Sequence, residues 1–384
     1  MRYHPPVPHS CAYKRTHGVS YCGPDCTALS SGVFEHVRLA PGAPLPDRDP
    51  NIVDVAVLDM NHGWPNVGHE GVVAAFKEAA CELSTPLAGA GLSIRAISFD
   101  VRRALQVPDP RDERFAIYVG TGGPGHINPR LNDGSDPLAQ GVAEDPSWEA
   151  PLFRLFDAIA ERDDAALLAV CHTFGLMCRW LDVALPVARG PEKGGKSEGV
   201  LDNLLTDAAR EHPLFAAFAR QLGPPGRLRV LDSRIYDLIP KAGAGRRVAI
   251  MATETLGVDG PPGEAMTMME VARDGSGRMP RVFGVNHHPE IIDRANLMGM
   301  LKIKLQRGEI SKEWYDLRMS TLWEHFPDER RDRELHATSD FTFLGPLRFH
   351  VTRAVRLRAD GIGRDFLPHE MDVDRALTAL LTLP

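Results

Sequence analysis

Between residues 52 and 171 the chain alternates short apolar runs with longer segments of helical periodicity. The apolar runs predict strands and the amphipathic segments predict helices. The predicted strands are 52–60, 92–100, 114–120 and 166–171, and the predicted helices are 67–83 and 151–162. Strands that are apolar along their whole length are typical of a parallel sheet buried on both faces, with helices as crossover connections. This pattern predicts an α/β fold with a mostly parallel central sheet and helices on both faces.

The pattern changes after a helical segment at 212–222. Strand-like runs follow at 227–233, 247–254, 265–272 and 281–287, and turn-rich segments such as GVDGPPGE join them. Short turn-rich connections are typical of antiparallel strands, so these runs predict antiparallel additions to the sheet. Farther on, helical patterns occur at 295–308 and 311–326, whereas residues 347–360 alternate apolar and polar positions as a half-exposed strand does.

These patterns divide the chain into an irregular N-terminal arm at 1–50, an α/β domain at 51–295 and a C-terminal α+β extension at 296–384. The arm contains six potential metal ligands: His4, His9, Cys11, His17, Cys22 and Cys26. Its one close cysteine pair has the spacing CxxxC, with no matching second pair. We therefore expect the arm to pack on the domain surface and to hold no metal.

Composition and charge exclude several classes of partner. The net charge is −7 and the charges are interspersed, so no basic stripe is available for nucleic acid. No run of eighteen apolar residues occurs, and the first thirty residues lack the apolar core of a signal peptide. We expect no membrane segment, a cytoplasmic location and, because the six cysteines are irregularly spaced, reduced thiols.

The segment AALLAVCHTFGLMCRW places Cys171 where a buried strand turns directly into a helix. Open α/β folds bind their ligands at this edge of the sheet, and a helix N-terminus favours a thiolate. Such an elbow needs small residues two positions away on each side; Ala169 fits well, and Thr173 fits less comfortably. Cys171 is either a nucleophile or an inert buried thiol, because free cysteine is among the most buried residue types.

Two further segments follow predicted strands. YVGTGGPGHINP, residues 118–129, contains glycines that let the backbone approach a ligand, although a plain glycine-rich turn has the same composition. RVFGVNHHPE ends in His288 and Glu290, whose spacing allows the carboxylate to fix one imidazole tautomer, although HPE is also ordinary turn chemistry. A base held by an orienting carboxylate is what a cysteine nucleophile requires.

The chain carries three motifs in order: a strand followed by GGPG, a strand that ends in a cysteine and turns into a helix, and a strand followed by HPE. Together they resemble the class I glutamine amidotransferases over residues 52–295. Softer matches are LDMNHGWPNVG at 58–68 and the segment 212–240. The resemblance implies that Cys171 is the nucleophile, that His288 is the general base and acid, and that Glu290 orients His288. It also implies an oxyanion hole formed by the backbone amides of Gly123 and His172, with no cofactor.

The chain departs from the family pattern at the elbow. The family reads GxCxGxQ, whereas Ala169, Thr173 and Gly175 stand here in place of Gly, Gly and Gln. The family's Gln helps to bind substrate glutamine, and His287 stands where the family usually has Phe. These differences concern the substrate more than the chemistry.

Three functions follow as hypotheses. The first is a cysteine-dependent glutamine amidotransferase-type amidohydrolase that acts on a γ-carboxamide through a thioester. The second is a γ-glutamyl hydrolase or acyltransferase of the same fold, and the third is a catalytically silent regulatory or binding homologue.

The partners expected for the leading hypothesis are a small-molecule amide and a separate protein. No ATP-binding or synthetase segment is visible, so an amidotransferase would need a synthetase partner. The extension carries large apolar residues that must be covered, either by an oligomeric or synthetase interface or by the α/β body. They are Trp314, Tyr315, Leu317, Trp323 and Phe326.

Overall fold

The computed structural model describes five nearly contiguous segments and part of the extension. They are residues 32–63, 66–139, 141–190, 195–256 and 260–291, short stretches between 298 and 320, and residues 329–366. The cysteines and histidines of the arm named above lie outside the described residues. So do Trp314, Leu317, Trp323 and Phe326 of the extension.

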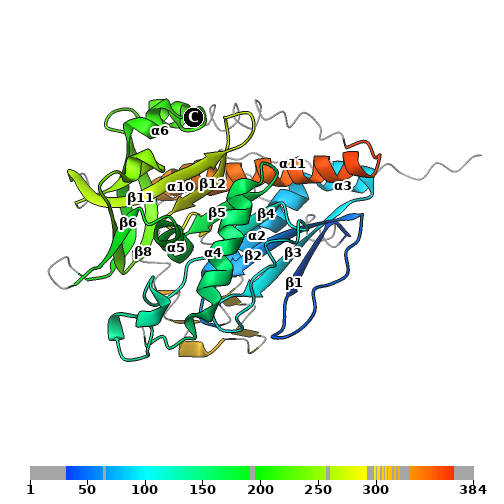
Figure 1. The fold of residues 1–384 in the computed structure, drawn as a ribbon. Helices are drawn as coiled ribbons and strands as arrows, with labels where there is room; N and C mark the ends of the chain where they lie inside the picture. The colour runs from blue at the N-terminus through cyan, green and yellow to red at the C-terminus, as the bar shows by residue number, and fades with distance from the viewer. Residues whose placement is uncertain are drawn as a thin grey trace, which may run out of the picture.

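A ten-stranded sheet runs through the molecule (Figure 1), in the order β1-β3-β2-β4-β5-β12-β11-β10-β7-β8. The first six strands in this order are parallel: β1 (Phe34–Arg38), β3 (Ser93–Asp100), β2 (Ile52–Asp59), β4 (Ile117–Gly120), β5 (Ala166–Val170) and β12 (Pro280–Val285). The rest pair antiparallel: β11 (Pro262–Arg273), β10 (Ala249–Thr255), β7 (Ser197–Leu205) and β8 (Arg227–Arg234). A separate antiparallel pair is formed by β6 (Ala184–Ala188) and β9 (Tyr236–Pro240).

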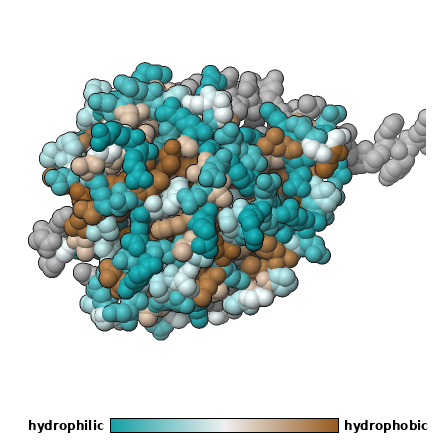
Figure 2. Space-filling view, viewed as in Figure 1, coloured by the Kyte–Doolittle hydropathy of each residue, from teal (hydrophilic) through white to brown (hydrophobic). Residues whose placement is uncertain are grey.

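Helices cover both faces of the sheet. One face carries α2 (Val67–Glu82), α3 (Ser84–Ala90), α7 (Phe215–Leu222) and α11 (Gly345–Gly361), and the other carries α4 (Glu149–Glu161) and α5 (His172–Trp180). The other described helical elements are α6 (Asp207–Glu211), 3-10 turns at Pro129–Leu131, Pro137–Ala139, Pro146–Trp148 and Ala244–Arg246 and, in the extension, α10 (Glu329–Ser339), followed by a π-helical turn at Asp340–Leu344. Figure 2 shows that polar side chains cover most of the visible face, with separate apolar patches between them.

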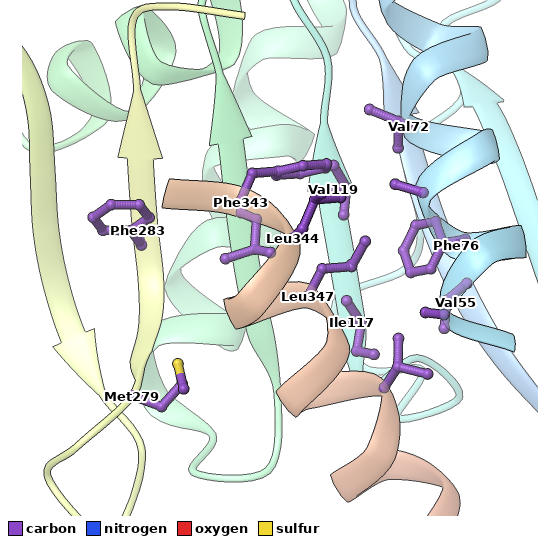
Figure 3. Packing of buried hydrophobic residues seen from close by; sticks show 14 of the residues in the cluster. Val55, Val72, Phe76, Ile117, Val119, Met279, Phe283, Phe343, Leu344 and Leu347 are labelled. Carbon is purple, nitrogen blue, oxygen red and sulfur yellow. The ribbon is translucent and has the colours of Figure 1, made fainter. Parts of the chain in front are cut away.

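Two cores form because successive strand residues point to opposite faces. On β2, Val55 and Val57 enter the core beneath α2 and α11, whereas Ala56 and Leu58 enter the core beneath α4 and α5. Figure 3 shows the first core, where Phe76 of α2 approaches the same strands as residues of the C-terminal helix. The predicted α/β fold, with a large central sheet flanked by helices, is confirmed.

Three expectations about secondary structure were wrong. The run at 281–287, expected to be an antiparallel addition, forms β12, which pairs parallel with β5 and antiparallel only with β11. The arm is not irregular throughout, because β1 (Phe34–Arg38) extends the parallel sheet beside β3. Residues 347–360 form most of α11, a helix, and no strand occurs in the described part of the extension. The buried positions Leu347, Val351 and Val355 recur every four residues and follow the helical period, which competes with the apolar–polar alternation in this segment.

The described part of the extension packs on the α/β body. Phe341, Phe343 and Leu347 lie in the same core as residues of β2 and β4. Tyr315 packs against a smaller cluster that includes Leu231 of β8. Most apolar residues of the extension that the structure describes are therefore covered by the chain itself, whereas Leu357 of α11 is exposed. No described helix is both long and apolar enough to cross a membrane.

Candidate active site

Cys171 lies at the junction between β5 and α5, as the N-cap of the helix. Its backbone has φ +48° and ψ −100°, a conformation that non-glycine residues rarely adopt. Its amide donates to the carbonyl of Val285 at 2.8 Å, which fixes the turn to the end of β12. Strain of this kind is found where a strand-to-helix turn must present a side chain at the edge of a sheet.

Thr173 fits the crowded elbow because its neighbour on β4 is glycine. A Cβ atom at Gly120 would overlap the side chain of Thr173. The Thr173 hydroxyl is buried and donates to the carbonyl of Thr121 at 2.7 Å. Gly120 on the adjacent strand therefore provides the space that the Thr173 side chain occupies.

The space beside Gly175 is filled by the side chain of Ile127. A Cβ atom there would lie 2.5 Å from Cδ1 of Ile127, and Ile127 is one of the residues that line the cavity at the elbow. An apolar side chain from the segment after GGPG therefore fills the space beside position 175.

His288 and Glu290 come together as their spacing predicts. Nδ1 of His288 donates to Oε1 of Glu290 at 2.9 Å; the Glu290 side chain is fully buried, and that of His288 is 13% exposed. Burial disfavours the imidazolium, but Glu290 and Cys171, with which His288 also hydrogen-bonds, hold the pKa of His288 well above its usual value. The structure thus brings Cys171, His288 and Glu290 into one chain of interactions.

The neighbouring His287 has a lowered pKa, in contrast to His288. It is buried, its Nε2 lies 3.2 Å from Oγ1 of Thr342 in the extension, and burial lowers the pKa of His287 to about 3. This side chain is therefore neutral near pH 7 and packs between the end of β12 and the extension.

Gly123 and His172 line the same cavity as Cys171. No described group accepts a hydrogen bond from the backbone amide of either residue. Burial, together with Arg102, lowers the pKa of His172 well below its usual value, and the ring hydrogen-bonds the backbone of Gly123. A neutral His172 ring thus connects the two backbone segments.

Arg102 hydrogen-bonds the GGPG loop. Its fully buried guanidinium pairs with the fully buried Glu144 at 2.7 Å, and its Nη1 donates to the carbonyls of Met60 and Pro124 at 2.9 and 2.5 Å. This pair was not predicted from the sequence, since no motif surrounds Arg102 and Glu144 is 42 residues away. The interaction fixes the loop that carries Gly123.

A cavity of about 380 Å³ opens at the elbow. Its wall beside Cys171 is the segment Leu231–Ser233 of β8, where the carbonyl of Ser233 lies 3.9 Å from the Cys171 sulfur and that of Leu231 accepts from the amide of His288 at 2.8 Å. Farther residues combine apolar side chains with charged ones. They are Ile235, Leu238, Tyr236, Lys196, Glu198 and Arg234.

Of the three described cysteines, Cys171 alone lines this cavity. Cys178 is buried on α5, and burial raises the pKa of its thiol far above the usual value. Cys81 lies on α2. In the part of the chain that the structure describes, no three His, Cys, Asp or Glu side chains are grouped to hold a metal ion.

Comparison of the sequence with protein-family models and with curated proteins gave no match. Among solved structures, the chain is similar to a glutamine amidotransferase from Thermotoga maritima, with 17% identity and a TM-score of 0.43 over 78% of this chain and 98% of that one. It is also similar to a glutamine amidotransferase from Methylobacillus flagellatus, with 15% identity and a TM-score of 0.38 over 74% and 93% of the two chains. A putative GMP synthase subunit from Thermoplasma acidophilum has 10% identity and a TM-score of 0.37 over 62% and 85%. Likenesses this distant carry no argument about activity, which has to come from the geometry of the site.

Proposed function

We propose that this chain is a cysteine-dependent amidohydrolase of the glutamine amidotransferase type, acting on a γ-carboxamide through a thioester. The observation that carries the proposal is Cys171, held at a strained strand–helix junction, in contact with His288 and open to a cavity. Glu290 holds the other side of the His288 ring at 2.9 Å. A nucleophile, a base and an orienting acid in this order suit acyl transfer.

In the first half of the reaction the Cys171 thiolate attacks the amide carbon. The negative charge that forms on oxygen accepts hydrogen bonds from the amides of Gly123 and His172. His288, as imidazolium, gives its proton to the amide nitrogen, the carbon–nitrogen bond breaks and ammonia leaves. The acyl group remains on sulfur as a thioester, and His288 is neutral.

In the second half of the reaction, water hydrolyses the thioester after ammonia has left. Neutral His288 takes a proton from water, the resulting hydroxide attacks the thioester, and the carbon–sulfur bond breaks. A carboxylic acid leaves and loses its proton to water, so the thiolate–imidazolium pair is restored. Glu290 keeps its partner in one orientation throughout and stabilises its positive charge.

A second candidate, a γ-glutamyl hydrolase or acyltransferase, is favoured by the covering of Gly175. Ile127 fills the space beside this position, so the site has no side-chain amide there to bind free glutamine. The silent homologue loses its best argument, because Gly120 accommodates Thr173.

The test is incubation with glutamine and with a panel of γ-glutamyl compounds, followed by measurement of ammonia and of the intact mass. Ammonia release from glutamine, an adduct on Cys171 and rapid labelling by a glutamine-mimicking diazoketone support the first function. Release of an amine other than ammonia, with no labelling by the diazoketone, supports the second. A Cys171 that is no more reactive than a free thiol excludes both.

Ammonia released by the first function needs a consumer, and we propose a separate synthetase partner. The described part of the extension packs on its own body, so the buried face of α11 is not available to that partner. Co-purification of the full chain with an ATP-dependent ligase, and faster glutamine hydrolysis in its presence, would support this proposal; an unchanged rate would count against it.

A further inference from the structure

The carboxylate of Glu290 is buried with one of its oxygens unpaired. Oε1 accepts the hydrogen bond from His288, whereas Oε2 has no hydrogen-bond partner among the described residues. The side chain has no exposed surface. Burying an incompletely paired carboxylate is costly, so its surroundings should supply positive potential.

Helix α2 presents two glycines to Glu290. A Cβ atom at Gly68 would lie 3.0 Å from Oε1, and a Cβ atom at Gly71 would lie 2.6 Å from the Glu290 carbonyl oxygen and 3.1 Å from its Cγ. Residues three apart lie on one face of a helix, so both glycines belong to the face turned to Glu290. Any other residue at position 71 would push Glu290 away.

The part of α2 that meets the carboxylate is its N-terminal turn. The helix has 16 residues and begins after Asn66, whose side chain accepts from the amide of His69 at 2.6 Å. No described group accepts a hydrogen bond from the amide of Gly68. The N-terminus of a helix carries partial positive charge and stabilises an adjacent anion.

We propose that Gly68 and Gly71 are positioning residues, which let the N-terminus of α2 approach Glu290, stabilise its charge and hold it against His288. The proposal rests on the proposed function for the role of His288 in catalysis, but the contact itself does not depend on any substrate. Three segments far apart in sequence then act as one unit: the start of α2, the elbow and the HPE turn.

The test compares Gly68→Ala and Gly71→Ala with Gly89→Ala, a matched control on α3 whose added Cβ would meet nothing within 4 Å. Alkylation of Cys171 by iodoacetamide is measured in the full chain across pH 5 to 9 by mass spectrometry. Displacing Glu290 weakens the imidazolium beside Cys171. We expect the alkylation profile to move to higher pH by about one unit, or roughly a tenfold slower reaction at pH 6, in both variants and not in the control.

A second arm separates positioning from general damage. In a Glu290→Gln background, adding Gly68→Ala should cause no further shift, because the group that the glycine positions is already changed. An unchanged profile in folded Gly68→Ala would overturn the proposal, and so would an equal further shift in the Glu290→Gln background. If Gly71→Ala fails to fold, Gly68→Ala decides alone. Because alkylation needs no substrate, failure of the proposed function would show separately, as absent ammonia release with the expected alkylation profiles.

Discussion

The charged groups at the elbow are buried or nearly so, and those between α2 and α11 are partly buried, yet the charges in the two groups are balanced differently. At the elbow, His288 lies between Cys171 and Glu290, and these two partners hold its pKa well above the usual value although burial opposes the charge. Because His288 lies between two groups that can be negatively charged, its protonated form is favoured.

Between α2 and α11, one cation meets three acids. Arg348 contacts Glu78, Glu82 and Asp340 at 3.2, 3.0 and 3.2 Å. Burial raises the pKa of Glu78 to about 7; Arg348 opposes the shift, and the neighbouring carboxylates add to it. Here the negative charges are in excess, and protonation of Glu78 reduces the repulsion between them.

The comparison shows that a perturbed pKa does not by itself identify an active site. The elbow cluster opens to a cavity and contains a residue with strained backbone. The helix cluster joins two packed helices, and none of its residues lines that cavity. We therefore expect changes at the first cluster to affect activity and changes at the second to affect stability.

The largest effect should come from Cys171→Ala. Loss of the nucleophile should lower amide hydrolysis by roughly 10⁴-fold or more, while the thermal midpoint changes little, because the side chain is only partly buried. Ammonia release and thermal unfolding are the measurements. Cys81→Ala is the control, since Cys81 does not line the cavity and should keep its activity. Hydrolysis near the wild-type rate in Cys171→Ala would refute the assignment.

The second effect separates the base from its orienting acid. His288→Ala should lower the hydrolysis rate by about 10³- to 10⁴-fold, because His288 transfers both protons. Glu290→Gln should have a smaller effect, on the order of 10- to 100-fold, since Glu290 acts through His288. Steady-state kinetics give the order of the two effects. Equal rates in both variants and the wild type would mean that HHPE is only a turn.

The third prediction concerns the extension. Leu347→Ala removes a fully buried side chain from the core beneath α11 and should lower the free energy of unfolding by about 2–5 kcal/mol. Leu357→Ala, on the same helix but 48% exposed, should change it by less than about 0.5 kcal/mol. Urea unfolding of the two variants compares them directly. Similar midpoints would indicate that α11 does not contribute to the core.

The smallest effect should appear at Glu78. Its pKa is raised to about 7 in the folded protein, so stability should fall as pH rises from about 4.5 to about 7. Glu78→Gln cannot lose that proton and should be more stable than the wild type by about 2 kcal/mol at pH 8, and no more stable at pH 4. Urea unfolding at both pH values measures the difference. An equal difference at the two pH values would show that titration of Glu78 is not the cause.

Most of the sheet could be predicted from the sequence because buried strands appear as local apolar runs, such as 52–60. Strands β1 and β7 were missed, since half-buried FEHVR and the mixed polar and apolar SEGVLDNLL contain no such run. Helix α11 was misassigned because its apolar residues satisfy two periodicities at once. The three motifs of the candidate site follow strands, so their meeting at one sheet edge followed from the fold class. The residues that hold them in place are not local in sequence. Arg102 and Glu144 are 42 residues apart, and Gly71 meets a residue more than two hundred positions away.

The contact between Gly120 and Thr173 also constrains the order in which this elbow can change. Threonine at position 173 is compatible only with glycine at position 120, because a Cβ atom on β4 would occupy the same space. In a lineage that carried glycine at both positions, threonine could enter at 173 without any second substitution. From then on, even alanine at position 120 would clash with Thr173 until a small residue returned at position 173. A replacement that is tolerated at one position would thus prevent substitution of the neighbouring glycine.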